Sequence, residues 1–129
     1  MNGLLLKGNG KGEFSPLSIL QSGIYIPGNG KALVKLQGSQ KNYLVAASQN
    51  KDNLKLFELA QKATLIKINP DDVSAVRTFK NGNIQKEEFY YGTSFLSQSA
   101  RFVSIDKNVI SIQITDSKGK VRSIRLGGE

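Results

Sequence analysis

The sequence predicts an all-β protein built from antiparallel sheets, and three observations lead to that prediction. Short apolar runs recur along the chain, and most are bounded by Gly, Asn, Asp, Ser or Pro. Toward the C-terminus the runs alternate between apolar and polar residues, as strands with one buried face do. Glycine-containing pairs that are typical of tight turns separate several of the runs. Short strands at such regular spacing indicate a β-sandwich or a barrel-like module.

The tetrapeptide Gly-Asn-Gly-Lys occurs twice in the first third of the chain, at residues 8–11 and 28–31. Glycine-rich loops can bind phosphate, but neither copy fits the known patterns. A Walker loop needs four residues before Gly-Lys-Ser/Thr, and a dinucleotide loop needs a third glycine where Glu13 and Leu33 stand. We therefore expect both copies to be turns. Their spacing would also suit a repeat, for which two copies are weak evidence.

Four apolar runs in the middle of the chain are expected to be strands: residues 32–36, 43–47, 54–59 and 64–68. The third run has an alternative. Between residues 53 and 62, Leu54, Phe57 and Ala60 could share one face of a helix, whereas the alternation of Leu54 and Leu56 suits a strand equally well.

The last quarter of the chain carries the strongest β signal. Residues 110–115 alternate between isoleucine and a polar residue. The sequence Asp-Ser-Lys-Gly-Lys at 116–120 supplies turn residues, and the apolar pattern returns over 121–126. This arrangement predicts a β-hairpin.

The composition excludes several classes of function. The 129 residues can bury one ordinary core, and 39% apolar with 22% charged residues is typical of a folded chain. The chain has no histidine, the commonest general acid-base group and nitrogen ligand for metals. It has no cysteine either, so thiolate chemistry and disulfides are absent. Without these two residue types we expect no cofactor. The three leucines at 4–6 are too few for a signal-peptide core or a membrane span, so we also expect no membrane insertion.

A net charge of +8 raises the alternative of a polyanion or nucleic-acid partner. The charge is spread evenly, with +4 in residues 1–60 and +4 in residues 61–129. The densest group of cations is Lys118, Lys120, Arg122 and Arg125. The first three could line one side of a hairpin, because alternate residues of a strand share a face. We favour the simpler interpretation of a solvated polar face with lysines at a sheet edge.

The stretch Phe-Tyr-Tyr-Gly-Thr-Ser-Phe-Leu-Ser-Gln-Ser-Ala-Arg, residues 89–101, is the one segment with the residues of a chemical site. Ser94 and Ser97 lack a nucleophile elbow, and no histidine can accept their protons. The adjacent acids of the pairs 71–72 and 87–88 would point to opposite faces of a strand. We therefore expect no catalytic residues and no enzyme activity.

Two interpretations of that stretch remain. In the first, the Gln98 amide and the Ser97 hydroxyl satisfy backbone groups at a tight corner, while Phe95 and Leu96 enter the core. In the second, the stretch is a platform for a sugar or peptide. Tyr90 and Tyr91 would then stack on the ligand, and Gln98 with Arg101 would donate directional hydrogen bonds. We favour the corner, since buried backbone groups need partners in every fold.

Parts of this sequence resemble two known families. The phrase Leu-Leu-Leu-Lys-Gly-Asn-Gly-Lys-Gly-Glu-Phe at 4–14 resembles the strand, turn and strand of an FG-GAP (VCBS-type) β-propeller repeat, and residues 22–59 resemble a blade of such propellers. The phrase Tyr-Tyr-Gly-Thr-Ser-Phe-Leu-Ser-Gln-Ser-Ala-Arg at 90–101 resembles the signature of the ASPIC/UnbV module. Residues 109–126 resemble the closing hairpin of that module.

The resemblance implies partial blade strands in 1–60 and an ASPIC/UnbV-like β module in 61–129, or one continuous β domain. It also implies that the chain is a piece of a longer bacterial protein, extracellular or in the cell envelope. The function it implies is non-catalytic binding of a protein or glycan at the cell surface. The family label also associates the module with RNA, which adds to the nucleic-acid alternative, but no motif of a known RNA-binding module is present.

We predict that the protein has no specific divalent-metal site. The propeller families bind calcium through alternating aspartates, whereas Asp71 and Asp72 are adjacent and would not aim their oxygens at one ion. The melting temperature should therefore be the same with and without micromolar calcium, because only a ligand of the folded state raises it. A higher melting temperature in calcium would contradict this prediction.

Overall fold

A computed structural model describes residues 3–60, 63–92 and 98–126 of the chain. Within these ranges the structure contains eleven strands and one helix. The strands are β1 (Leu5–Gly8), β2 (Phe14–Leu17), β3 (Asn29–Gln37), β4 (Tyr43–Asn50), β5 (Asp52–Glu58), β6 (Thr64–Lys67), β7 (Asp72–Phe79), β8 (Ile84–Glu88), β9 (Phe102–Ile105), β10 (Val109–Asp116) and β11 (Val121–Arg125), and the helix α1 is Ile19–Ser22.

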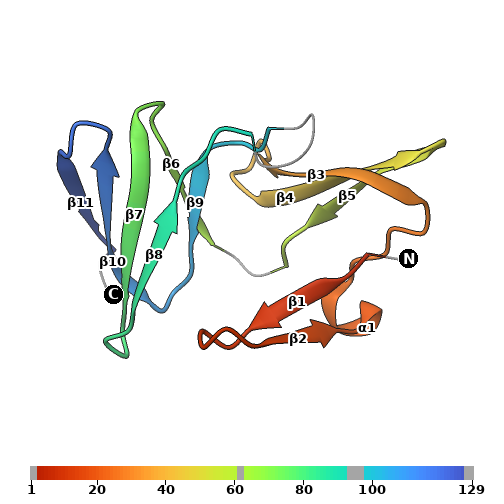
Figure 1. Ribbon diagram of the computed structural model, residues 1–129, viewed down its shortest axis with the longest axis horizontal. Helices are drawn as coiled ribbons and strands as arrows, with labels where there is room; N and C mark the ends of the chain where they lie inside the picture. The colour runs from red at the N-terminus through yellow and green to blue at the C-terminus, as the bar shows by residue number, and fades with distance from the viewer. Residues whose placement is uncertain (1–2, 61–62, 93–97, 127–129) are drawn as a thin grey trace.

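The strands form four antiparallel sheets, in the orders β1-β2, β3-β4-β5, β6-β9 and β11-β10-β7-β8 (Figure 1). The all-β prediction is confirmed, and none of the described sheets closes into a barrel. The one helix was not predicted. Ser18 caps it by accepting a hydrogen bond from the Gln21 N–H, while the Gln21 side chain accepts one from the Ser18 N–H. No helix of the described chain is long and apolar enough to cross a membrane.

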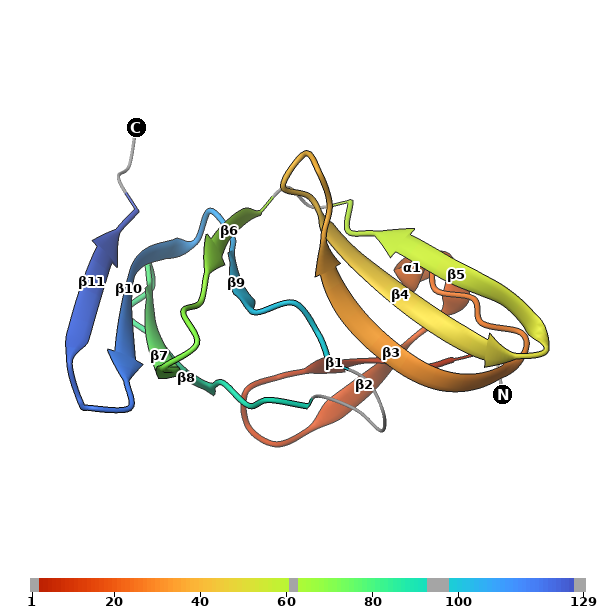
Figure 2. The same cartoon turned by 90° about the horizontal axis from the view of Figure 1, so that it is seen from above.

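The main core lies between two of these sheets. β6 and β9 pack against the four-stranded sheet and separate it from the β3-β4-β5 sheet (Figures 1 and 2). The buried residues of this core come from β7, β9, β10 and the residue after β6: Ile68, Ala75, Val103, Ile105, Val109, Ile112 and Ile114. Burial of branched aliphatic side chains from both sheets makes this part of the molecule sandwich-like.

The N-terminal strands leave much more apolar surface exposed. In the β3-β4-β5 sheet only Ala46, Ala47 and Gln49 are buried. The β1-β2 hairpin and α1 lie on one side of this sheet (Figure 1). Leu54 and Leu56 of β5 are 66% and 58% exposed. Packing therefore stabilises the C-terminal sheets more than the N-terminal ones.

The two Gly-Asn-Gly-Lys copies have different structures. The first forms the turn of the β1-β2 hairpin, as predicted. The second is not a turn, because β3 begins at Asn29 and carries a β-bulge between Gly30 and Ala32. The N–H of Gly28 donates to Oε1 of Gln49 at 2.6 Å. A Cβ at Gly28 would lie 2.7 Å from that oxygen, so the glycine permits a close approach to β4 rather than a turn.

Other strand predictions can be compared directly with the structure. The C-terminal hairpin is confirmed, with Ser111 to Thr115 of β10 paired to Arg125 to Val121 of β11. The open choice at residues 53–62 is decided for a strand, β5, over the part that the structure describes. The β7-β8 hairpin was not predicted, although an Asn-Gly pair at 81–82 forms its turn with Gly82 at φ 82°.

Replacing Ile112 with alanine should destabilise the protein by about 2–5 kcal/mol, because its side chain is fully buried between the two sheets and its loss leaves a cavity. The free energy of unfolding, measured by urea denaturation, tests this. Ile110→Ala on the same strand is the matched control. Ile110 is 43% exposed, so the change should cost much less. If both variants lost the same free energy of unfolding, Ile112 would not be a core residue and the described packing would be wrong.

Candidate functional site

A short segment of the C-terminal half lies along the edge strand β3. The Ala100 N–H donates to the Lys35 carbonyl at 2.8 Å, and the Lys35 N–H donates to Oγ of Ser99 at 3.0 Å. The Lys35 ammonium also donates to the Phe102 carbonyl at 3.0 Å. These bonds extend the N-terminal sheet with a strand-like segment from the other half of the chain.

Phe102, the first residue of β9, fixes this contact. Its ring is 2% exposed and meets the Tyr43 ring edge-on, with the ring centres 5.2 Å apart at an angle of 89°. The Lys35 ammonium lies 5.0 Å from the centre of the same ring. An edge-to-face aromatic pair and a cation near the ring both favour this geometry. The two halves therefore meet around one buried phenylalanine.

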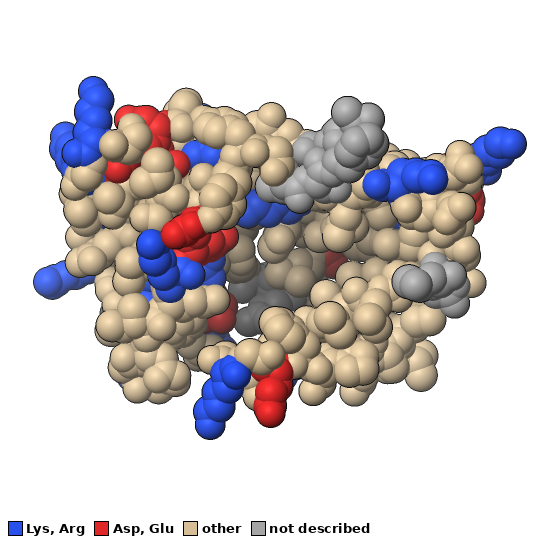
Figure 3. Space-filling model, viewed as in Figure 1, with Lys and Arg blue, Asp and Glu red and all other residues tan. Residues whose placement is uncertain are grey.

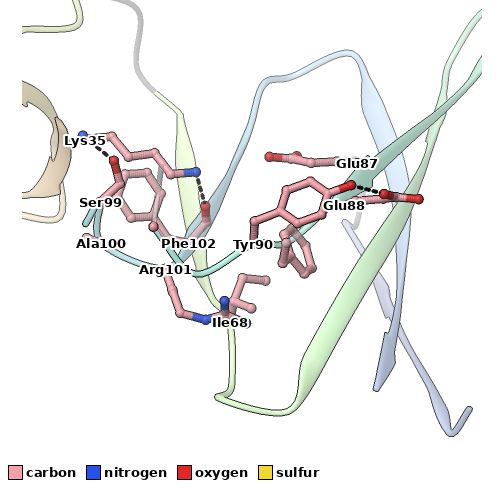
Figure 4. A pocket seen from close by; sticks show the side chains of 11 residues that line it. Lys35, Ile68, Glu87, Glu88, Tyr90, Ser99, Ala100, Arg101 and Phe102 are labelled. Atoms are coloured by element: carbon pink, nitrogen blue, oxygen red, sulfur yellow. Dashed lines mark hydrogen bonds between the residues drawn. The ribbon is translucent and has the colours of Figure 1, made fainter. Parts of the chain in front are cut away.

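A pocket of about 340 Å³ opens beside this contact. The side chains that line it include Lys35 from β3, Glu87 and Glu88 from β8, Tyr90, Arg101 and Phe102. Figure 4 shows that they come from opposite walls, with Lys35 and Phe102 on one side and the two glutamates on the other. The surface of the molecule, seen from the same side as in Figure 1, is hollowed near its middle (Figure 3). The pocket thus combines both charge signs with aromatic surface.

The charges on the pocket walls influence one another. Burial lowers the pKa of the Lys35 ammonium, and the cations Arg77 and Arg101 lower it further, while Glu87 opposes the shift. Glu87 is held by an ion pair with Arg77. Burial also raises the pKa of the Tyr43 phenol, with a smaller contribution from Glu87. Glu87 is therefore the anion whose charge raises the pKa of both Lys35 and Tyr43.

Tyr90 lies on the same side of the pocket as the carboxylate of Glu88, to which it is hydrogen-bonded (Figure 4). Its hydroxyl donates to Oε2 of Glu88, and the Lys86 ammonium donates to Oε1 of Glu88 at 3.1 Å. The hydroxyl lowers the pKa of Glu88, with Lys86 adding to the effect, and the carboxylate raises the pKa of Tyr90. The Tyr90 side chain remains 67% exposed, so the ring face is available to a ligand.

Arg101 is positioned by several groups. Nη2 donates to the carbonyls of Asp72 at 2.8 Å and Asn69 at 3.2 Å. The guanidinium carbon lies 4.2 Å from the centre of the Tyr91 ring, whose hydroxyl donates to the Pro70 carbonyl at 2.6 Å. Nε and Nη1 of Arg101 are buried and have no hydrogen-bond partner among the residues that the structure describes. Arg101 is therefore held in place by two backbone carbonyls and a tyrosine ring beside the pocket that it lines.

The four residues predicted for a ligand platform are only partly brought together. Tyr90 and Arg101 line the pocket, and Tyr91 stacks under Arg101. Gln98 is exposed, so the interpretation of it as a buried corner residue is wrong. Tyr90 and Tyr91 are both exposed, since β8 ends at Glu88 and both lie in the following loop. Ser94, Phe95, Leu96 and Ser97 lie outside the described residues.

The predicted cation group Lys118, Lys120, Arg122 and Arg125 does not form one surface. Lys118 and Lys120 lie in the turn before β11, where their N–H groups bond Oδ1 of Asp116. Arg122 turns inward and pairs with the buried Asp72, with both Nη···Oδ distances at 2.5 Å. Arg125 is on the opposite face, because it lies three positions after Arg122 and successive residues of a strand alternate between faces. Because Arg122 is paired with the buried carboxylate of Asp72, it does not form a common cationic surface with the other three residues.

Three charged residues of the pocket were not predicted as site residues from the sequence. Lys35 interrupts the apolar run 32–36, and that interruption is the one signal that could have pointed to it. Glu87 and Glu88 were considered only as an acid dyad. They do engage different partners, Arg77 for Glu87 and Lys86 with Tyr90 for Glu88. Across the described ranges, no three Asp or Glu side chains gather in a way that could hold a metal ion.

Comparison with known proteins gives no relative for this chain. No family model matches it, and neither the curated proteins nor the solved structures include a significant match.

Replacing Arg122 with methionine should cost about 3 kcal/mol at neutral pH, the lower end for a broken buried ion pair, because Arg122 is partly exposed while the Asp72 side chain is fully buried. Arg125→Met on the other face of β11 is the control and should change stability by less than about 0.5 kcal/mol. Both values come from urea denaturation.

The same experiment has a defined pH dependence. Arg122 lowers the pKa of Asp72, so this pair stabilises the fold above the ordinary carboxyl pKa, and the stabilisation is lost as the pH falls through the lowered value. The difference between the parent protein and Arg122→Met should therefore shrink in acid. A difference independent of pH would contradict the ion-pair explanation.

Proposed function

We propose that this protein is a non-catalytic β module that binds a glycan in the pocket between its two halves. The observation that carries the proposal is the combination of an exposed aromatic ring with donors and acceptors around one cavity. Sugars present apolar C–H faces and many hydroxyls, so a site for them needs aromatic stacking surface and directional polar groups. A protein side chain with similar chemistry is the other ligand that this pocket suits.

The supporting chemistry is distributed over the walls of the pocket. Tyr90 supplies the stacking surface, and the carboxylates of Glu87 and Glu88 accept hydrogen bonds from hydroxyls. Arg101 lines the same cavity and adds a positive charge beside these acceptors. The volume of about 340 Å³ is near the lower end for small-molecule sites, which suits one or two sugar rings.

The wider assignment rests on the sequence resemblance. The FG-GAP-like and ASPIC/UnbV-like phrases support a place in a bacterial secreted or cell-envelope protein, with residues 1–60 as partial blade strands. A role in binding at the cell surface is in keeping with a glycan ligand. The polyanion alternative loses support from the geometry of β11, where Arg122 is already paired with Asp72.

Binding to a glycan array tests the proposal. Tyr90→Ala should weaken binding of the best glycan about tenfold, because it removes the exposed stacking surface of the pocket. Tyr25→Ala is the matched control, since Tyr25 is 47% exposed and does not line this pocket. Its binding should equal that of the parent protein.

Salt dependence separates the two ligand classes. Affinity for a neutral glycan should hardly change between low and high salt, whereas affinity for heparin or RNA would fall steeply as counterions rebind. Tight heparin binding that Tyr90→Ala leaves intact, with no glycan bound, would overturn the proposed function.

A further inference from the structure

A second pocket lies in the N-terminal half, away from the candidate site. Its volume is about 330 Å³, and it separates the β1 region from one face of the β3-β4-β5 sheet. The sheet contributes Leu33, Val45, Ala47 and Phe57. Leu33 pairs with Ala47, and Val45 pairs with Phe57, so all four share this face of the sheet.

The opposite wall is also apolar. It is formed by Leu4 and Leu5 at β1 and by Ile24 and Ile26, which follow the helix. No acidic residue is among the described residues that line the pocket. Leu4 is 63% and Leu33 is 52% exposed, so apolar surface stays in contact with water in the unliganded protein. A ligand that covers this surface would gain hydrophobic stabilisation.

One charged side chain, Lys31, lines the same pocket. Lys31 is the extra residue of the β-bulge between Gly30 and Ala32, and bulges redirect the side chains that they carry. It is exposed and has no hydrogen bond or ion pair with any described residue. The bulge therefore gives an otherwise apolar pocket one exposed lysine, whose ammonium has no partner among the described residues.

We propose that this pocket binds a small amphiphile with an anionic head, a medium-chain carboxylate, with the chain between β1 and the sheet and the carboxylate at Lys31. The charge of Lys31 selects an anion, and the apolar walls select a hydrocarbon chain. A cavity of about 150 Å³ holds the six carbons of benzene. By the same proportion a pocket of about 330 Å³ has room for roughly thirteen carbons, so a ten-carbon chain fits. The site is separate from the glycan pocket and does not depend on it.

The probe for the test is decanoate below its micellar concentration, titrated by calorimetry into the unaltered protein. Each buried methylene should tighten the Kd about fourfold, so decanoate should bind more tightly than octanoate by roughly sixteenfold. Decanol, which has the same chain without the charge, should bind more weakly than decanoate. Equal Kd values for octanoate and decanoate, or no binding of decanoate, would overturn the proposal.

Two pairs of variants assign the site. Lys31→Gln should weaken decanoate up to about fivefold and leave decanol unchanged, as expected for one exposed ion pair. Lys11→Gln, in the other Gly-Asn-Gly-Lys copy, should bind like the parent because Lys11 lies in the β1-β2 turn. Leu33→Gln should weaken both ligands, whereas Leu54→Gln on the opposite face of the sheet should not.

These four positions are substantially exposed, so the variants should keep the parent's circular dichroism spectrum. Unchanged decanoate binding by both Lys31→Gln and Leu33→Gln would overturn the assignment. So would binding to vesicles of phosphatidylglycerol without binding to monomeric decanoate, because the ligand would then be a membrane surface.

Discussion

The burial of Phe102 against Tyr43 and Lys35 is the contact on which the arrangement of this protein depends. It joins β9, which belongs to the C-terminal core, to β3 and β4 of the N-terminal sheet. The backbone bonds of Lys35 with Ser99 and Ala100 fix the position of the segment along the sheet edge. The pocket exists because this contact holds Lys35 and Arg101 opposite Glu87 and Glu88.

A second polar cluster secures the other side of the same segment. Asp72 accepts hydrogen bonds from Arg122 and from the Asn69 N–H, while Arg101 donates to the Asp72 carbonyl. Burying a carboxylate destabilises a fold unless the carboxylate is paired with a cation and hydrogen-bonded. Asp72 has both kinds of partner, Arg122 and the Asn69 N–H. The cluster ties β7, β11 and the segment before β9 together. Net charge alone is therefore a poor guide to partners. Arg122, for example, counts among the eighteen Lys and Arg residues but is paired with Asp72 inside the fold.

The two halves of the chain offer different recognition chemistry. The site at their junction is polar, with an exposed tyrosine and charges of both signs, whereas the pocket beside β1 is apolar with one exposed lysine. The C-terminal sheets bury a contiguous aliphatic core, and the N-terminal sheet does not. Apolar surface that an isolated sheet leaves exposed is available for a ligand, because covering it is energetically favourable.

The sequence by itself determined the all-β class, the β10-β11 hairpin and the first Gly-Asn-Gly-Lys turn, because these depend on residue alternation and on turn residues a few positions apart. It did not separate the second Gly-Asn-Gly-Lys copy from the first. That difference arises from Gln49, which is distant in sequence and binds the Gly28 N–H. The same holds for the site. The sequence singled out Tyr90 and Arg101 but missed Lys35. It also favoured a corner role for Gln98, which is exposed, and grouped Arg122 with exposed cations. The partners of Lys35 and Arg122 were decided by the tertiary structure alone, since Phe102 and Asp72 lie 67 and 50 positions away in the sequence and local pattern carries no record of them.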